Sequence, residues 1–268
     1  MDWTLVPIFL SIGGVVGFIA GLLGIGGGMT MIPLLTLIFS YQHFPPEHIL
    51  HIAVATSLAT IVFTSISSVW THHAHDAVVW PIFWKLAPGL LAGSLLGPQL
   101  VSGLSTAALS GVFAAFTAFT ATRLLRNAKP KATRVLPGAP GMFAVGGAIG
   151  VLSSIVGAGG AFVSVPFMTA CNVRIHNAVA TSAALGLPIA AAGTVGYLVA
   201  GLRQTDLPPY TVGYLNLPAL FAIASASVFA APAGARMAHR WPVIRLRRAF
   251  AALLYVVAAF FLWKVFAH

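Results

Sequence analysis

The sequence predicts an all-α polytopic membrane protein, built from two five-segment inverted repeats with short, broken helices at two glycine-rich blocks. Three observations predict this class: an apolar composition, charges gathered near segment ends, and an internal duplication. Of the 268 residues, 59% are hydrophobic and 7% are charged, whereas a soluble domain carries about a quarter charged residues. The composition therefore excludes a soluble enzyme, a disordered chain and a nucleic-acid-binding protein with a basic face.

Ten apolar segments separated by polar residues are the candidate helices. A membrane span needs about 20 apolar residues, so a chain of this length holds roughly eight to ten membrane segments. The segments lie at 4–23, 28–40, 48–71, 79–101, 105–124, 140–156, 162–171, 178–201, 212–235 and 247–266. The single cysteine, Cys171, excludes a disulfide framework and any metal site made of several cysteines.

Charge placement predicts the orientation. A basic linker over 123–139 separates an N-terminal transmembrane repeat (1–122) from a C-terminal one (140–268). Basic residues near segment ends favour the cytoplasm, and a cytoplasmic linker leaves only Arg203 and Lys264 of the fourteen Lys and Arg residues outside. We therefore expect a multi-pass protein of a bacterial inner (plasma) membrane, with both termini periplasmic. The net charge of +10 then results from the basic residues that set the orientation. These residues could also bind anionic lipid headgroups, and they need no nucleic-acid partner.

The two halves repeat the same pattern. The block Gly24–Pro33 recurs as Gly157–Pro166, 133 residues later. A second element, His51, Ala55, Thr56 and Ser57, recurs 125 residues later as His176, Ala180, Thr181 and Ser182. Because each half has an odd number of segments, the two copies are expected to cross the membrane in opposite senses. Inverted repeats are common in secondary transporters, whose substrate sites lie where the repeats meet.

The glycine blocks are the strongest candidates for a binding site. Each glycine costs a helix about 1 kcal/mol relative to alanine, so the blocks predict breaks followed by short helices. Backbone groups freed within a membrane must be buried in protein or face a water-filled cavity, and the N–H groups that start the next helix attract anions. We predict substrate contacts from Gly24, Gly26, Gly27, Gly28 and Met29, and from Gly157, Gly159, Gly160, Ala161 and Phe162.

Close helix packing is the alternative role for these glycines. It suits two stripes of fourfold spacing, Gly13-Gly17-Gly21 and Gly89-Gly93-Gly97, better than it suits the clustered blocks.

Hydroxyl and imidazole groups follow the blocks. Thr56, Ser57, Thr181 and Ser182 could donate to anion oxygens or bond back to the preceding helical turn. His51 and His176 could carry protons or form structural hydrogen bonds near a membrane interface.

A group of His72, His73, His75 and Asp76 could bind a divalent metal or form a solvated loop. Neither a Ser-His-Asp set nor paired carboxylates suggests catalysis, so we expect no enzyme and no cofactor.

The chain resembles the sulfite exporter TauE/SafE family. The resemblance rests on Gly24–Pro33, Ala55–Ser57, Gly157–Pro166 and Ala180–Ser182, and its two-half organisation covers essentially the whole chain. Ala161, where the first half has Gly28, departs mildly from the pattern. The resemblance implies an inner-membrane permease for sulfite, sulfoacetate or related small organosulfur anions, usually exported. A transporter of another small anion such as a carboxylate, and a membrane metal-handling or assembly protein, stay open as alternatives.

Overall fold

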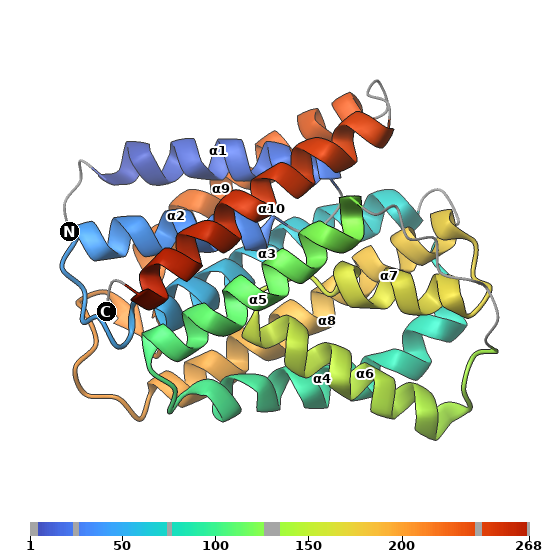
Figure 1. Ribbon diagram of the computed structural model, residues 1–268, viewed down its shortest axis with the longest axis horizontal. Helices are drawn as coiled ribbons and strands as arrows, with labels where there is room; N and C mark the ends of the chain where they lie inside the picture. Colours follow the sequence, from blue (N-terminus) through green and yellow to red (C-terminus); the bar gives the residue numbers. More distant parts are fainter. Residues whose placement is uncertain (1–4, 24–26, 74–76, 126–134, 239–242, 267–268) are drawn as a thin grey trace.

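The computed structural model describes residues 5–23, 27–73, 77–125, 135–238 and 243–266. Within these residues the chain forms ten α-helices and one short antiparallel hairpin (Figure 1). The elements in chain order are α1 (Val6–Leu23), α2 (Gly28–Tyr41), α3 (Ile49–His73), α4 (Trp80–Val101), α5 (Thr106–Leu125), α6 (Ala139–Ile155), α7 (Ala161–Ala170), α8 (Ile175–Gly201), β1 (Thr211–Val212), β2 (Leu215–Asn216), α9 (Leu217–Ala238) and α10 (Val243–Phe266).

Each predicted segment is a helix in the structure, and three of them begin elsewhere than expected. Helix α10 begins at Val243 rather than at residue 247. Helix α8 begins at Ile175 rather than at residue 178, and α9 begins at Leu217 rather than at residue 212. The hairpin of β1 and β2 occupies the residues before α9, and Gly213 makes its turn at a φ of 55°. Glycine takes this left-handed conformation without steric cost, so the apolar run from 212 turns back before the helix begins.

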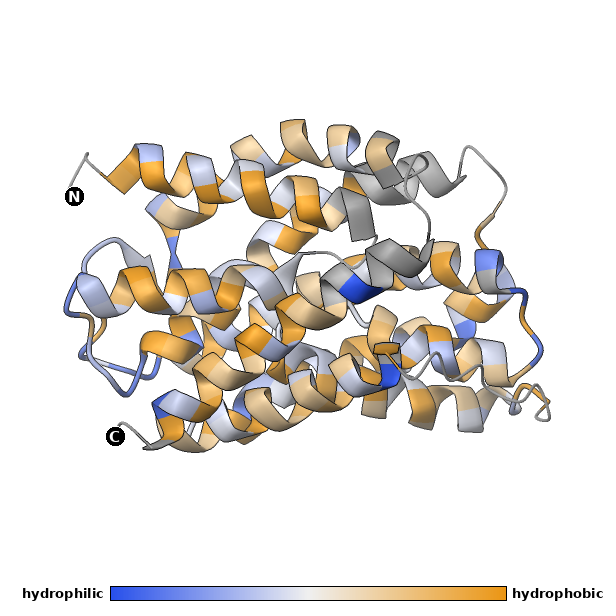
Figure 2. Cartoon of the chain, turned by 45° about the horizontal axis from the view of Figure 1, so that its top comes forward, coloured by the Kyte–Doolittle hydropathy of each residue, from blue (hydrophilic) through white to orange (hydrophobic). Residues whose placement is uncertain are grey.

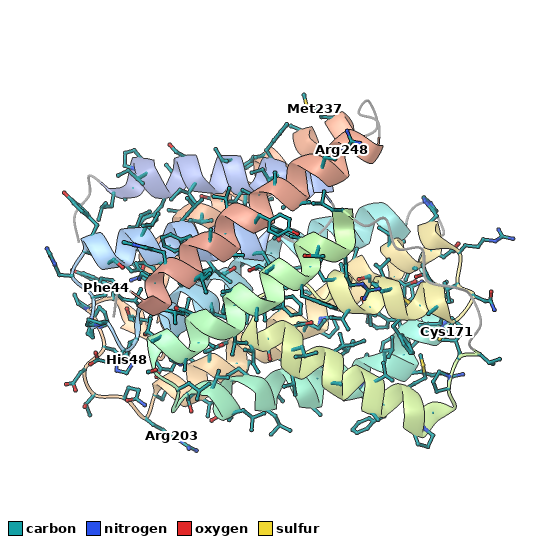
Figure 3. All side chains as sticks on the ribbon, in the orientation of Figure 1. Phe44, His48, Cys171, Arg203, Met237 and Arg248 are labelled. Atoms are coloured by element: carbon teal, nitrogen blue, oxygen red, sulfur yellow. The ribbon has the colours of Figure 1, made fainter. Side chains whose placement is uncertain are left out.

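The helices lie alongside one another, with their connections at two opposite ends of the molecule (Figure 1). We call these the terminal end, where α1 begins and α10 ends, and the linker end, where α6 begins. Phe44, His48 and Arg203 lie at the terminal end (Figure 3). The same view places Cys171 and Arg248 at the linker end. Arg203, which charge placement assigned to the outer side, and Arg248, which it assigned to the inner side, therefore lie at opposite ends of the molecule.

Helices α3 and α8 pack against each other in the interior, and every residue of α3 from Ile49 to Ile61 is buried. Around them α1 packs on α9, α4 packs on α6, and α5 packs on α10. When each helix is replaced by its counterpart in the other half, the α1–α9 pair becomes the α6–α4 pair, and the α3–α8 and α5–α10 pairs are each unchanged. The smaller contacts do not follow this pattern, because in the described part of the chain the counterpart of the α2–α10 contact, α5–α7, is weaker or absent.

Small-residue stripes make two of these contacts. A Cβ atom at Gly17 of α1 would lie 2.5 Å from the Cα of Ser227 on α9. At Gly93 of α4, an added Cβ would overlap the carbonyl oxygen of Gly147 on α6. Helix backbones can approach this closely only where side chains are absent or small. The packing role predicted for these stripes is confirmed at Gly13, Gly17, Gly89, Gly93 and Gly97.

The helices are apolar enough for a membrane protein. Three ranges in the described part of the chain are long and apolar enough to cross a membrane, Ile49–Ile66, His176–Gly201 and Leu217–Gly234. Helices α2 and α7 have 14 and 10 residues, and at about 1.5 Å per residue neither reaches across a hydrocarbon core of about 30 Å. Apolar residues cover the helices and hydrophilic ones gather in the connections (Figure 2).

Candidate functional site

The two short helices begin in the same way. Gly27 caps α2 at a φ of 67° and Gly160 caps α7 at a φ of 77°, left-handed values that glycine adopts readily. The Gly27 carbonyl accepts a 2.7 Å hydrogen bond from the Thr30 hydroxyl, and the Gly160 carbonyl accepts one of 2.9 Å from Ser164. The first N–H groups of a helix have no acceptor within it and carry its positive dipole end. Both glycine blocks therefore present the anion-attracting end of a helix to the interior.

The two glycine blocks touch each other. Gly28, the first residue of α2, lies against the carbonyl oxygen of Gly157, and a Cβ atom at Gly28 would overlap that oxygen. Gly157 itself has a φ of 59° and lies beside Ile32 and Val54. Two segments 129 residues apart are thus joined at backbone contact distance. The structure brings Gly28 and Gly157 into contact, whereas Gly24 and Gly26 lie outside the described residues.

The surroundings of the blocks are closely packed. Gly27, Gly28 and Met29 are buried, and so are Gly157, Gly159 and Gly160, whereas Ala161 and Phe162 are half-buried. Helix α8 flanks the second block, because a Cβ at Gly186 would lie 3.3 Å from the Gly159 carbonyl oxygen.

Serine hydroxyls lie beside both blocks, in different arrangements. The Ser57 hydroxyl is 3.5 Å from the Gly28 carbonyl oxygen, a long distance for a hydrogen bond. The Ser164 and Ser182 hydroxyl oxygens are 2.6 Å apart. Because Ser164 donates to the Gly160 carbonyl, Ser182 donates to Ser164, and both hydroxyl protons are used. The first half has Met31 in the place of Ser164, and its own hydroxyl is one position earlier, at Thr30, where the second half has Val163.

The threonines of the duplicated element form a reciprocal pair of bonds. The Thr56 hydroxyl oxygen on α3 accepts a 3.1 Å hydrogen bond from the N–H of Asn216, the residue before α9. The Thr181 hydroxyl oxygen on α8 accepts a 2.9 Å bond from the N–H of Val79, the residue before α4. Each threonine therefore fixes the entry to a helix of the other half. A direct contact of these hydroxyls with substrate stays a prediction.

The two histidines have unlike surroundings. His51 is buried, with Nε2 3.0 Å from the Val101 carbonyl oxygen and Nδ1 3.3 Å from that of Glu47. His176 is exposed in the first turn of α8. The hydrogen bonds of His51 fit the structural alternative, and proton transport by either residue stays a prediction.

The predicted metal group lies outside the side chains that the structure describes. This applies to His72, His73, His75 and Asp76. Among the described residues, none of the His, Cys, Asp and Glu side chains form a group of three that could hold a metal ion.

Sequence reasoning missed several buried polar residues. Lys264, expected on the outer side of the membrane, is buried in the last turn of α10 and donates a 3.1 Å hydrogen bond to the Ser40 hydroxyl. Tyr197 and Tyr214 are fully buried, and Asn216 is buried beside Thr56. One signal could have located Asn216: Val79-Trp80-Pro81 and Asn216-Leu217-Pro218 have proline at the same place relative to the start of a helix.

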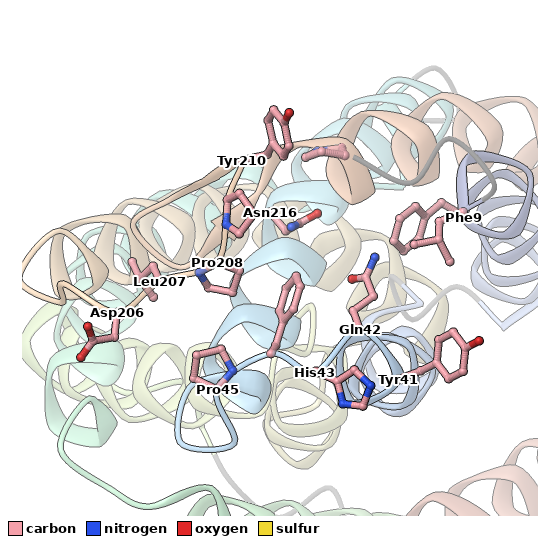
Figure 4. A pocket seen from close by; sticks show the side chains of 14 residues that line it. Phe9, Tyr41, Gln42, His43, Pro45, Asp206, Leu207, Pro208, Tyr210 and Asn216 are labelled. Atoms are coloured by element: carbon pink, nitrogen blue, oxygen red, sulfur yellow. The ribbon is translucent and has the colours of Figure 1, made fainter.

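A pocket of about 750 Å³ opens at the terminal end. The loop after α2, from Tyr41 to Pro45, forms one wall and the residues from Asp206 to Tyr210 form another (Figure 4). Asn216 also lines the pocket, and its N–H is bonded to Thr56. Because Ser57 follows Thr56 and lies beside Gly28, this series of contacts leads from the pocket to the glycine blocks.

Comparison with known proteins identifies the family. The profile of the Sulfite exporter TauE/SafE family matches residues 9–261. A "Probable membrane transporter protein" of Haemophilus influenzae is 32% identical over 257 residues, covering 96% of this chain and 97% of the relative. A protein of the same description from Methanocaldococcus jannaschii is 27% identical over 269 residues and covers 96% of both chains.

A further relative comes from Bacillus subtilis, where a "Probable membrane transporter protein" is 28% identical over 240 residues, covering 87% of this chain and 90% of the relative. No solved structure matches the chain. The family and these descriptions indicate a membrane transporter rather than an enzyme. With the family profile matched over nearly its whole length, the chain belongs to the sulfite exporter TauE/SafE family of membrane transporters.

Proposed function

We propose that this transporter exports small sulfur oxyanions or organosulfur anions, such as sulfite or sulfoacetate, across a bacterial inner membrane. The contact between Gly28 and Gly157 is the observation that carries the proposal. It joins the start of α2 to the glycine block that precedes α7. The start of each short helix carries free backbone N–H groups and a positive dipole end. Glycine lets an anion approach such a backbone closely, so the site needs no arginine.

The fold favours an inverted-repeat mechanism for this transport. Exchange of the two halves leaves the α3–α8 and α5–α10 pairs unchanged and converts α1–α9 into α6–α4. The Thr56 and Thr181 hydroxyls likewise make corresponding bonds in the two halves. In such transporters one repeat rocks against the other around a fixed site near the midplane. The pocket at the terminal end is then the approach from the periplasmic side, with both termini on that side and the basic linker in the cytoplasm.

The choice of a sulfur anion rests on the family name and on chemistry. The relatives are described only as membrane transporter proteins, and helix N-termini bind carboxylates as well as sulfur oxyanions. The test must therefore compare substrates directly.

Thermal unfolding of the detergent-purified protein is the first experiment, with sulfite, sulfoacetate, taurine, sulfate and small carboxylates added in turn. We expect sulfite or sulfoacetate to raise the melting temperature in a concentration-dependent way, because a ligand that binds only the folded state stabilises it. Efflux of the same anion from loaded proteoliposomes should follow. Stabilisation and transport of a carboxylate alone would favour the alternative substrate class, and a response to none of the anions would contradict anion transport.

A further inference from the structure

Two neighbouring buried tyrosines have hydroxyls without a partner. Tyr197 of α8 and Tyr214 of the hairpin turn are fully buried, and their rings are edge to face with centroids 6.3 Å apart. Neither hydroxyl oxygen has a hydrogen-bond partner among the described residues. Burying a hydroxyl unpaired is costly, and nearly all buried polar groups in proteins are paired. Two unpaired hydroxyls on adjoining rings are therefore the feature that calls for an explanation.

The residues around the two phenols point to the chemistry of a ligand that would pair them. The Tyr214 ring stacks on His51 at 5.2 Å, and His48 lies at 5.7 Å from it. Both ring nitrogens of His51 already face backbone carbonyl oxygens, so this imidazole accepts from neither phenol. Burial raises the pKa of the Tyr214 phenol, which therefore stays protonated and can donate.

The two carboxylates in this part of the described structure, Glu47 and Asp206, are both exposed, so neither is buried with the phenols. A site with two hydroxyl donors, and no buried carboxylate to compensate a positive charge, suits an anion better than a cation. An oxyanion with several oxygens can accept from both phenols at once.

The position of the phenols fits a transport route. His51 lies about one turn before Thr56 on α3, so Tyr214 stacks on α3 nearer the terminal end than the glycine blocks. Asn216, two residues after Tyr214, lines the pocket and bonds to Thr56. Tyr214 therefore belongs to the hairpin that separates the pocket from the interior.

We propose that Tyr197 and Tyr214 form a second anion subsite, in which their hydroxyls donate to the oxygens of the transported anion as it moves between the pocket and the glycine blocks. This inference rests on the proposed function and adds to it a site away from those blocks. It makes the two phenols binding residues for a sulfonate or sulfite group.

Tyrosine-to-phenylalanine variants test the subsite, because they remove only the hydroxyl. We would compare Tyr197→Phe, Tyr214→Phe and the double variant with the wild-type protein. Tyr255→Phe is the matched control, since the Tyr255 hydroxyl bonds to Thr122 on the exposed side of α5 and α10. The readouts are the melting temperature without anion and the sulfite or sulfoacetate concentration that gives half-maximal stabilisation.

Without anion, the Tyr197 and Tyr214 variants should melt at the wild-type temperature or above it, because phenylalanine leaves no unpaired hydroxyl. The double variant should need about tenfold more anion for half-maximal stabilisation, the effect of losing hydrogen bonds to a charged group. Tyr255→Phe should respond to the anion as the wild type does.

Two results would overturn the subsite. One is an unchanged anion requirement in the double variant while the wild type is stabilised, as expected if water alone pairs these hydroxyls. The other is a lower melting temperature without anion, which would show a structural partner within the protein. If the wild type itself responds to none of the anions, the proposed function fails, and the subsite fails with it.

Discussion

The hydroxyl oxygen of Thr56 accepts the backbone N–H of Asn216, across 160 residues of sequence. This bond holds the hairpin before α9 against the central helix α3. The matching bond from the N–H of Val79 to Thr181 holds the segment before α4 against α8, where Asn177 also donates to the Ala77 carbonyl. The two bonds lie at corresponding places in the two halves, so each half supplies the acceptor that orders a connection in the other.

Removing either threonine acceptor should destabilise the fold. Thr56→Val and Thr181→Val keep the side-chain shape but leave a buried N–H unpaired, which costs about 1–3 kcal/mol. We expect both variants to unfold at lower temperature or denaturant concentration than the wild type in detergent.

Two further variants control for this effect. Thr60→Val is the matched case, because the Thr60 hydroxyl donates to the Thr56 carbonyl within its own helix and holds no connection. Thr56→Ser keeps the acceptor and should restore most of the stability. If Thr60→Val lost as much stability as Thr56→Val, the loss would come from replacing any buried threonine of α3 by valine. It would then not come from the bond between Thr56 and Asn216.

Replacing a glycine of helix α1 by alanine should lower stability only where that glycine faces α9. Gly14→Ala meets open space and should be neutral or stabilising by up to about 1 kcal/mol, since alanine favours helix. Gly17→Ala places a Cβ 2.5 Å from the Ser227 Cα and should push α1 away from α9. Unfolding of both variants in detergent measures this difference. Equal stability of Gly14→Ala and Gly17→Ala would contradict the α1–α9 contact.

Gly28→Ala tests whether contact between the glycine blocks is needed for transport. Its Cβ would overlap the Gly157 carbonyl oxygen, so the start of α2 must move away from the second glycine block. We expect at least about a tenfold loss in anion efflux, as misplacement by about 1 Å can cause. Gly103→Ala, with open space around it, is the control. Wild-type efflux by Gly28→Ala protein in proteoliposomes would refute a site at this contact.

Substitutions at the two capping glycines report on folding as well. Gly27 and Gly160 have left-handed φ angles, and a Cβ at these positions would meet Ala20 or Ile189. Valine at either position therefore strains the backbone, and a loss of transport has meaning only if the variant protein is shown to be folded.

Patterns of residue type made the helices and the packing stripes predictable. Fourfold glycine spacing identified Gly17 and Gly93 as contact points, and the glycine clusters identified the starts of α2 and α7. The hairpin before α9 was missed because its residues continue an apolar run, and only the turn at Gly213 separates it from the helix.

The candidate site was less predictable than the fold, for a physical reason. For Thr56 and Thr181 the sequence suggested donation to an anion or a bond back to the preceding helical turn, and the structure shows a further role in which their oxygens accept from backbone N–H groups. Every residue except proline has such an N–H, so residue type carries no signal for Asn216 or Val79 as partners. The buried position of Lys264 beside Ser40 likewise depends on how α10 meets α2.

Single-cysteine labelling should test the proposed orientation. Cys171 is buried, so it should give little background. With a membrane-impermeant maleimide, we expect Tyr210→Cys at the terminal end to react in intact cells. Val135, which is 88% exposed, lies within the basic linker, so Val135→Cys should react only after the cells are permeabilised. The reverse pattern would invert the topology.

The last prediction concerns the energy source, and it follows from where the carboxylates lie. The chain has four, Asp2, Glu47, Asp76 and Asp206, and each lies outside the bounds of the helices in the described structure. Proton-coupled transporters usually place an ionisable group along the transport path. An inside-negative potential of about 100 mV already favours exit of each negative charge by about 2.3 kcal/mol, roughly a fiftyfold gradient. We therefore expect electrogenic export without an obligatory proton or sodium partner.

Proteoliposomes loaded with sulfite or sulfoacetate test this directly. A valinomycin–potassium gradient that makes the interior negative should accelerate efflux, with no pH or sodium gradient present. His176→Ala should transport normally, because His176 is exposed at the start of α8. His51→Ala should lower stability through loss of the 3.0 Å hydrogen bond to Val101, yet the folded fraction should still export the anion in response to the potential. Strict dependence on a pH or sodium gradient, or loss of transport by folded His51→Ala protein, would instead establish a coupling ion.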